Sequence, residues 1–185
     1  MRKDQRTTLF LDTEFTGLRQ NAELISLALV GPEKQWFYAE FTDYDAGQLS
    51  DWHRTNVLPY LWLEKQSKIS LPGDGVCLRA DRVAVSDALK DWLSRWGDVQ
   101  IWADVPAYDW VLFCELFGGS LHLPDGVPYM VMDLATLFHI RGMDTNISRQ
   151  GYVFGDAGPP PEWPQHNALV DAWVGLECLK KLLNA

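Results

Sequence analysis

Cysteine is scarce in this sequence of 185 residues, and long apolar runs are missing. The three cysteines, Cys77, Cys114 and Cys178, are widely spaced, with no CxxC pair and no companion histidine. This spacing favours neither a disulfide framework nor a zinc site. The apolar run at residues 9–11 ends at Asp12, too early for the core of a signal peptide or for a membrane span. We therefore expect a cytoplasmic protein with reduced cysteines and no membrane association.

Basic residues are also in the minority, since 16 Lys and Arg face 25 Asp and Glu, a formal net charge of −9. That balance argues against a protein that holds nucleic acid mainly through a broad basic surface, because counterion release from phosphates needs clustered Lys and Arg. The acidity also has a second interpretation. If several carboxylates bind divalent cations, the cations reverse the local field and themselves attract phosphate.

Apolar residues, in contrast, are plentiful enough for an ordered core. Hydrophobic residues make up 47% of the chain and aromatic residues 12%, far from the composition of disordered proteins. A chain of this length buries roughly 70% of its unfolded surface. We find no internal repeat and no shift in composition, so we expect residues 1–185 to form a single domain.

The pattern of apolar residues predicts an α/β fold. Four short segments have the length and partial alternation of strands, namely residues 7–12, 23–30, 35–41 and 99–103. The first three follow one another closely, which predicts an antiparallel meander. Helical spacing occurs in residues 83–96, 106–117, 132–141 and 167–183.

Helix ends and loops are the less regular part of this prediction. For the helix at 83–96, Ser86 or Asp87 is the expected residue near its start. Segments 64–81 and 142–165 look irregular, because they are rich in Gly, Pro and charge. Loops of that length in a compact domain are usually functional or mobile.

A pair of carboxylates follows the first apolar strand, at Asp12 and Glu14. Residues i and i+2 of a strand point to the same face, so the two side chains should emerge together at the rim of the sheet. Like charges placed side by side are unfavourable unless a cation lies between them. A divalent metal would resolve this conflict, but a solvated acidic turn explains a lone D-x-E motif equally well.

Two further acidic positions fall near the starts of helices. Asp109 follows the fourth strand, where α/β folds place their sites, although an Asp near a helix N-terminus is also favoured by the helix dipole. His166 precedes Asp171 by five residues, so that one can move protons while the other binds metal. A capping His-Asn pair at His166 and Asn167 is the simpler alternative.

In combination these motifs resemble those of the DEDDh exonucleases, the 3′→5′ nucleases that include oligoribonuclease, RNase T and polymerase proofreading subunits. The order is D-x-E on the first strand, Asp on a mid-chain helix, and H-x4-D on the last helix. Within that family the chain is most similar to the RNase AS type of exoribonuclease. The similarity is carried by residues 12–15, 23–26, 38–41, 57–59, 102–109 and 166–171.

The resemblance implies an RNase H-like exonuclease fold, in which helices flank a mixed sheet made of the three-strand meander and parallel strands. It also implies two divalent cations, Mg2+ or Mn2+, bridged by Asp12. Glu14 and Asp171 would complete one metal site, and Asp109 would support the other. One ion, with His166 as general base, would activate water, and the other would stabilise the departing 3′-oxygen.

The activity implied is that of a 3′→5′ exoribonuclease, which hydrolyses single-stranded RNA to nucleoside 5′-monophosphates, with a bias toward adenosine. Alternatives that keep the chemistry are a DNA 3′→5′ exonuclease of the proofreading or repair type and an oligoribonuclease. An inactive nucleic-acid-binding module and an unrelated metal-dependent phosphatase fit the residues less well. A homodimer is expected because this nuclease group is commonly dimeric.

The resemblance also implies the substrate contacts. Residues after the Glu lie against the terminal sugar and base in this family, and here they are Phe15, Thr16 and Gly17. Tyr108 is a second wall, while Glu14 and His166 also face the substrate. Phe15 could stack on a base, although packing in the core explains it as well.

The chain departs from the family pattern ahead of the second Asp. Many DEDDh enzymes carry His-Asn there, whereas this sequence reads Ala103-Asp104-Val105-Pro106-Ala107-Tyr108. The departure affects the substrate contacts expected from this segment and not the metal role of Asp109. Asp104 is therefore a competing metal ligand. We prefer Asp109, because an aromatic residue precedes the Asp in the family, as Tyr108 does here.

Overall fold

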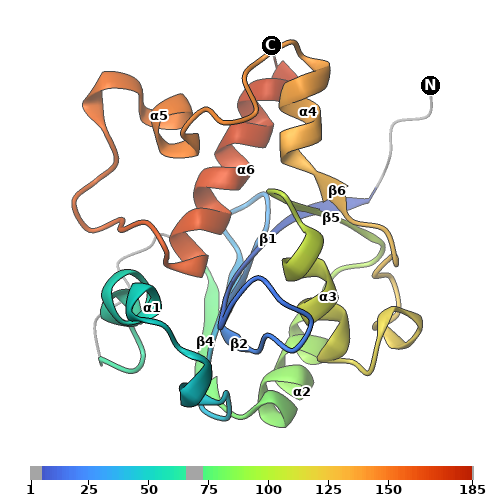
Figure 1. Cartoon of the computed structure of the whole chain (residues 1–185). Helices are drawn as coiled ribbons and strands as arrows, with labels where there is room; N and C mark the ends of the chain where they lie inside the picture. The colour runs from blue at the N-terminus through green and yellow to red at the C-terminus, as the bar shows by residue number, and fades with distance from the viewer. Residues whose placement is uncertain (1–5, 66–72, 185) are drawn as a thin grey trace.

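The computed structural model describes residues 6–65 and 73–184, and its centre is a six-stranded sheet in the order β4-β3-β2-β1-β5-β6 (Figure 1). The strands are β1 (Thr7–Phe15), β2 (Leu24–Val30), β3 (Trp36–Phe41), β4 (Gly75–Ala80), β5 (Val99–Ala103) and β6 (Met132–Asp133). Strands β1, β2 and β3 form an antiparallel meander. The outer strands add in parallel, β4 to β3, β5 to β1 and β6 to β5. This is the mixed sheet that the sequence predicts.

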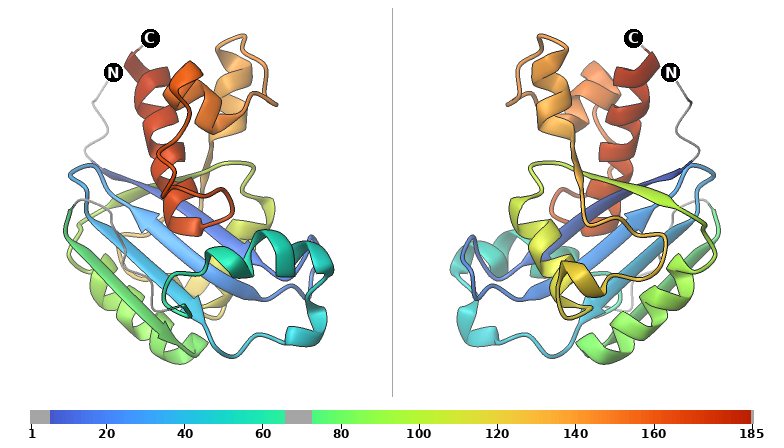
Figure 2. Two further views of the ribbon diagram at one scale, coloured as in Figure 1. Left: turned by 90° about the vertical axis from the view of Figure 1, so that its left-hand side faces the viewer. Right: turned by 90° about the vertical axis from the view of Figure 1, so that its right-hand side faces the viewer.

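Helices cover both faces of the sheet (Figure 2). The α-helices are α1 (Asp51–Asn56), α2 (Arg82–Leu93), α3 (Ala107–Glu115), α4 (Leu134–Ile140), α5 (Arg149–Phe154) and α6 (Ala168–Asn184). Short 3-10 turns lie at η1 (Ala46–Gln48), η2 (Leu58–Tyr60), η3 (Ser120–His122) and η4 (Gly155–Ala157). None of the helices in the described ranges is long and apolar enough to cross a membrane.

Alternation along β1 divides the core into two layers. Leu9 and Leu11 pack with α2 and α3, whereas Phe10 packs with α4 and α6 on the other face. Helix α6 lies directly on the sheet at Gly175, where an added Cβ would fall 2.1 Å from the ring of Phe10. Because side chains alternate along a strand, Asp12 and Glu14 continue the face of Phe10 and meet the start of α6.

The prediction that residues 64–81 are irregular is wrong for their last part. Gly75–Ala80 forms the edge strand β4, which pairs with β3, while 66–72 lie outside the described residues. The strand has an exposed and a half-buried face, so its sequence lacks the continuous apolar run of an inner strand. Gly75 lies flat on the indole of Trp36, where an added Cβ would be 2.0 Å from the ring. Its strand conformation therefore depends on a neighbour distant in sequence.

The segment 142–165 is also more ordered than predicted, because it contains α5 and η4. A six-residue helix is marginal by itself, and α5 is held by its surroundings. The hydroxyl of Ser148 accepts a hydrogen bond from the backbone N–H of Gly151, 3.1 Å away. The ammonium of Lys181, on α6, donates to the backbone carbonyls of Tyr152 and Val153.

Two helix starts differ from the prediction, and one short helix was not predicted. Helix α2 begins at Arg82, capped by the side chain of Asp81, instead of near Ser86 or Asp87. The hydroxyl of Ser86 donates to the carbonyl of Leu116. The segment 132–141 starts as strand β6 before it becomes helical, and α1 was not predicted at all.

Candidate active site

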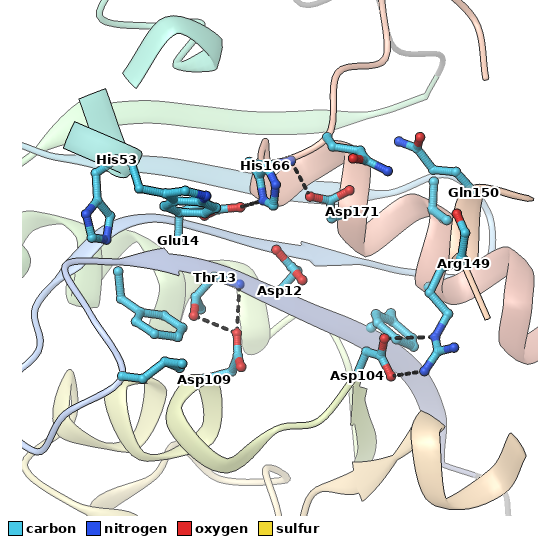
Figure 3. Close-up of a pocket in the computed structure, with 18 of the residues that line it drawn as sticks. Asp12, Thr13, Glu14, His53, Asp104, Asp109, Arg149, Gln150, His166 and Asp171 are labelled. Atoms are coloured by element: carbon cyan, nitrogen blue, oxygen red, sulfur yellow. Dashed lines mark hydrogen bonds and ion pairs between the residues drawn. The ribbon is translucent and has the colours of Figure 1, made fainter. Parts of the chain in front are cut away.

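Strand β1 carries Asp12 and Glu14 on the face that meets α6. The strand continues to Phe15, so Asp12 lies inside it and not at its end as predicted. Glu14 is 9% exposed, and across the ladder it faces Ser26 on β2. Figure 3 shows Asp12 between Glu14, Asp109 and Asp171. The two carboxylates therefore emerge side by side, as their i, i+2 spacing predicts.

Asp109 reaches the same place from the first turn of α3. Its Oδ1 accepts hydrogen bonds from the backbone N–H of Thr13, at 3.1 Å, and from the hydroxyl of Thr13, at 2.7 Å. Thr13 points to the opposite face from its neighbours Asp12 and Glu14. The residue inside the D-x-E motif thus fixes the third carboxylate.

His166 lies in the turn just before α6, and Asp171 lies in the first turn of that helix. The backbone of His166 has φ 62°, in the left-handed region that few non-glycine residues adopt. This conformation lets the N–H of His166 donate to Oδ2 of Asp171, 2.8 Å away. One potential ligand atom from each of Glu14, His166 and Asp171 lies within 4.8 Å of the others.

Burial raises the proton affinity of this cluster. The pKa of Asp12 lies well above its usual value because of burial first and the negative charges of Asp171, Asp109, Glu14 and Asp104 next. The pKa of Glu14 is raised well above its usual value by burial, Asp171 and Asp109. Burial raises the pKa of Asp171 to about 7, against two backbone hydrogen bonds that lower it.

Burial also raises the pKa of Asp109, although the hydrogen bonds from Thr13 oppose the shift. Four clustered carboxylates, of which Glu14 is buried and the other three are half-buried, favour a positive partner, and oxygen ligands suit hard divalent ions. The chemistry of this donor set therefore fits Mg2+ or Mn2+.

The imidazole of His166 stands at the open side of the cluster, 40% exposed. Its Nδ1 lies 3.9 Å from Oε1 of Glu14, and burial lowers its pKa. The ring of Trp52 contacts it edge-on, with 4.9 Å between ring centroids. A neutral imidazole in this position can accept a proton.

The four carboxylates and His166 line one pocket of about 820 Å³. Of the predicted substrate residues, Phe15 and Gly17 also line it. Phe15 is half-buried and packs against both the core and Tyr108, whose ring centroid is 5.9 Å away. Phe15 thus serves the core and the pocket at once.

Thr16 and Tyr108 do not line this pocket. Thr16 is 2% exposed, and its hydroxyl donates to Oε1 of Gln48 at 2.7 Å and accepts from the N–H of Glu23 at 3.0 Å. Its side chain therefore supports the loop that follows β1. Tyr108 supports Phe15 from behind.

Asp104 is committed to an ion pair with Arg149. Its two carboxylate oxygens accept from the Arg149 guanidinium at 2.9 and 3.0 Å. Asp109 has no cation beside it among the described residues, so it is the better candidate for binding a metal.

Several pocket residues were missed by the sequence prediction. They are Phe10, Leu18, Ser50, Trp52, His53, Ser148, Arg149, Gln150, Gln165, Val174 and Gly175. Most come from α1, from α5 or from the turns around them, elements whose short sequences carry no periodic signal. The only available signal was the unusual length of the segment 142–165.

Comparisons with known proteins agree with this arrangement. Residues 7–183 match the family described as "3'-5' exoribonuclease Rv2179c-like domain". Two relatives from strains of Mycobacterium tuberculosis, described as 3'-5' exoribonuclease MT2234.1 and 3'-5' exoribonuclease Rv2179c, are each 32% identical over 165 residues, 88% of this chain and 85% of theirs. The solved RNase domain of the yeast Pop2 protein covers 96% of this chain and 78% of its own, with a TM-score of 0.57 at 16% identity. That likeness shows the fold.

Proposed function

This chain belongs to the 3'-5' exoribonuclease Rv2179c-like family, and from that premise we propose that it hydrolyses single-stranded RNA from the 3′ end to nucleoside 5′-monophosphates. The observation that carries the proposal is the convergence of Asp12, Glu14, Asp109, Asp171 and His166 on one pocket. These residues come from three segments that are distant in sequence, namely β1, α3 and the start of α6. Acidic side chains that clustered by chance would not be expected to match the order of the family's motifs as well.

The carboxylates of Asp12, Glu14, Asp109 and Asp171 would hold a pair of divalent cations, Mg2+ or Mn2+. When bound, such cations supply a stronger nucleophile and stabilise negative charge on the reacting oxygens. Oxygen ligands and a strongly negative, buried setting suit this role. Asp109 keeps its place through Thr13, and Asp171 keeps its place through the N–H of His166.

His166 acts as the general base in this proposal. Burial keeps its imidazole neutral near pH 7, so a ring nitrogen can take the proton of the attacking water. The water oxygen then bonds to the phosphorus of the last phosphodiester, and the bond from phosphorus to the 3′-oxygen breaks. The leaving oxygen gains a proton from solvent, which yields a shortened chain with a free 3′-hydroxyl.

Recognition of the chain end falls to the pocket wall formed by Phe15 and Gly17. The ring of Phe15 offers a face to the terminal base, a contact worth about 1–3 kcal/mol. Because such stacking tolerates every base, this wall gives no base preference by itself. Any bias toward adenosine needs another contact.

Glu14 is the group by which RNA would be preferred over DNA. It is 9% exposed at the pocket wall, so a deoxy chain end would leave an acceptor there without its partner. An unpaired buried polar group costs about 1–3 kcal/mol, and 1.36 kcal/mol corresponds to a tenfold change in rate. We expect ribo ends to be cleaved about ten- to a hundredfold faster than deoxy ends.

The test offers 5′-labelled and 3′-labelled RNA and DNA of matched sequence, with Mg2+ and with EDTA. Stepwise shortening of the 5′-labelled RNA, early release of the 3′-label as mononucleotide and loss of both in EDTA are the expected results. Cleavage inside the chain, or activity unchanged in EDTA, would reject the proposal.

Single-turnover rates on oligomers that end in ribo-A, ribo-U and deoxy-A separate the alternatives. Equal rates for ribo-A and deoxy-A would reject the RNA preference, and a faster deoxy-A end would identify a DNA exonuclease. Equal rates for ribo-A and ribo-U would reject only the adenosine bias. A strong drop beyond a few nucleotides in length would identify an oligoribonuclease.

A further inference from the structure

The active-site pocket continues past the carboxylates toward α5. Asp104, Ser148, Arg149 and Gln150 line this part of it. Figure 3 shows Arg149 and Gln150 on one side of Asp12 and His53 on the other. The predicted contacts to the terminal nucleotide do not reach this side, so it has no assigned role.

The first turn of α5 is held firmly, which gives its side chains defined positions. Besides its ion pair with Asp104, the guanidinium of Arg149 donates to the carbonyls of Ile147, at 2.7 Å, and of Thr145, at 3.0 Å. It also lies over the ring of Phe138, 4.4 Å from the centroid. Every nitrogen of this guanidinium has a protein partner, so Arg149 anchors the turn and has little capacity left for phosphate.

Ser148 is occupied as well, because its hydroxyl caps α5 through Gly151. The side chain of Gln150 is not occupied in the way that those of Ser148 and Arg149 are. Its side-chain Nε2 is buried and has no hydrogen-bond partner among residues 6–65 and 73–184, and the residue is 8% exposed. Buried amide groups without partners are rare in proteins.

The pocket that Gln150 lines is partly apolar. Phe10, Val174 and Gly175 also line it, and they offer no polar side chain. Half a turn about the last side-chain bond exchanges the amino group and the carbonyl oxygen, so either can face the pocket. A molecule bound in the pocket would supply the hydrogen-bond partner that Nε2 lacks within the described part of the chain.

We propose that Gln150 is a specificity-determining residue that hydrogen-bonds the penultimate nucleotide, on the 5′ side of the scissile phosphate. The inference rests on the proposed function, which places the terminal nucleotide at Phe15 and Gly17. The phosphate then lies at the carboxylates, and the preceding nucleotide continues on the opposite side of Asp12, toward α5. A carboxamide is both donor and acceptor, which matches a ribose 2′-hydroxyl and the edge of a base alike.

The experiment compares wild type with Gln150→Met, which keeps the length of the side chain and removes its hydrogen bonds. Gln35→Met, in the turn between β2 and β3, is the matched control. Substrates are RNA oligomers with the same terminal nucleotide and a penultimate ribo-A, 2′-deoxy-A or ribo-U. Single-turnover rates with Mg2+ are measured for each pair.

We expect Gln150→Met to slow cleavage of the penultimate ribo-A substrate by about three- to tenfold, the usual worth of one hydrogen bond. The same variant should barely slow the one substrate that already lacks the partner. That substrate is deoxy-A if the contact is to the sugar, and ribo-U if it is to the base. Gln35→Met should behave as wild type throughout.

An equal loss on all three substrates would overturn the proposal, because it would mean that Gln150 acts only through the fold. Unchanged rates on all three would overturn it too. If Gln150→Met does not fold, Gln150→Asn retracts the amide by one methylene and should lose the same discrimination. A wild-type protein that releases no nucleotides would overturn the proposed function itself, a result distinct from an active enzyme without coupling at Gln150.

Discussion

At the scale of single residues, the site holds several carboxylates so close together that their negative charges repel one another. Asp12, Glu14 and Asp171 would each be negative at neutral pH in water, yet burial raises the pKa of all three, and the negative charges of neighbouring carboxylates raise the pKa of Asp12 and Glu14 further. Carboxylates clustered in this way destabilise the folded protein unless cations bind to them. Asp12 carries the largest share of this repulsion, because four other carboxylates raise its pKa.

Asp12→Asn should therefore abolish turnover and leave the metal-free fold intact or more stable. The amide keeps the size of the side chain, removes one carboxylate from the cluster and is a weaker ligand for a divalent cation. Turnover and the midpoint of thermal unfolding in EDTA test this together. A variant with near-wild-type activity would rule out the metal role of Asp12.

His166 has a separable role. His166→Ala should lower kcat by about 10²–10⁴-fold, the usual contribution of general-base catalysis. Metal affinity should change little, since the four carboxylates stay in place. Calorimetric titration with Mn2+ provides the second measurement, and a collapse of affinity would make His166 a ligand and not a base.

At the scale of elements, the start of α6 determines the positions of both His166 and Asp171. Asn167 is fully buried there, and its Oδ1 accepts hydrogen bonds from the N–H groups of Leu169 and Val170. Its Nδ2 donates to the carbonyl of Tyr60, 2.7 Å away. One side chain thus caps the helix and ties it to η2.

Asn167→Ala should destabilise the protein by about 1–3 kcal/mol, because it removes a helix cap and leaves the carbonyl of Tyr60 without its donor. We also expect weaker Mg2+ binding, because Asp171 loses its fixed position. Asn167→Asp is the matched variant, which keeps the cap and loses the two bonds that the amide nitrogen donates, to the carbonyl of Tyr60 and to the hydroxyl of Tyr38. Thermal unfolding should rank wild type above Asn167→Asp and Asn167→Ala; equal stability of all three would contradict the role of this cap.

A helix or strand could be predicted from the sequence where the apolar spacing of its own residues specifies it. The meander, β5 and the long helices α2, α3 and α6 have apolar spacing that matches the core, and the structure confirms them. Strand β4 and helices α1 and α5 depend on contacts with distant neighbours, such as Trp36 and Lys181. No local pattern could have indicated them.

At the scale of the whole molecule, the site also has a part that the sequence predicted and a part that only the three-dimensional structure shows. The structure brings together the four acidic residues and His166, which the order of motifs identified. The walls contributed by α1 and α5 came only from the three-dimensional structure, and so did the ion pair that occupies Asp104. The single domain, the homodimer and the cytoplasmic location stay predictions.

The protein as a whole should respond to pH and metal together. The pKa of Asp171 is about 7 in the folded chain, above its ordinary value of 3.8, and the pKa of Asp12 and Glu14 is raised as well. A folded state that holds protons more tightly than the unfolded chain loses stability as pH rises. In EDTA the contribution of Asp171 is complete below about pH 4 and is lost as pH rises through about 7.

We therefore expect the unfolding midpoint of the metal-free protein to fall between pH 5 and pH 8, and less steeply in Asp12→Asn. Divalent cations bind the ionised carboxylates, so saturating Mg2+ should stabilise the protein more at pH 8 than at pH 5. At a concentration a hundred times the dissociation constant, the gain is about 2.7 kcal/mol. Thermal unfolding at the two pH values, with Mg2+ and with EDTA, measures both effects. A metal-free midpoint that rises with pH, or an Mg2+ effect larger at pH 5, would contradict the shared burial of these carboxylates.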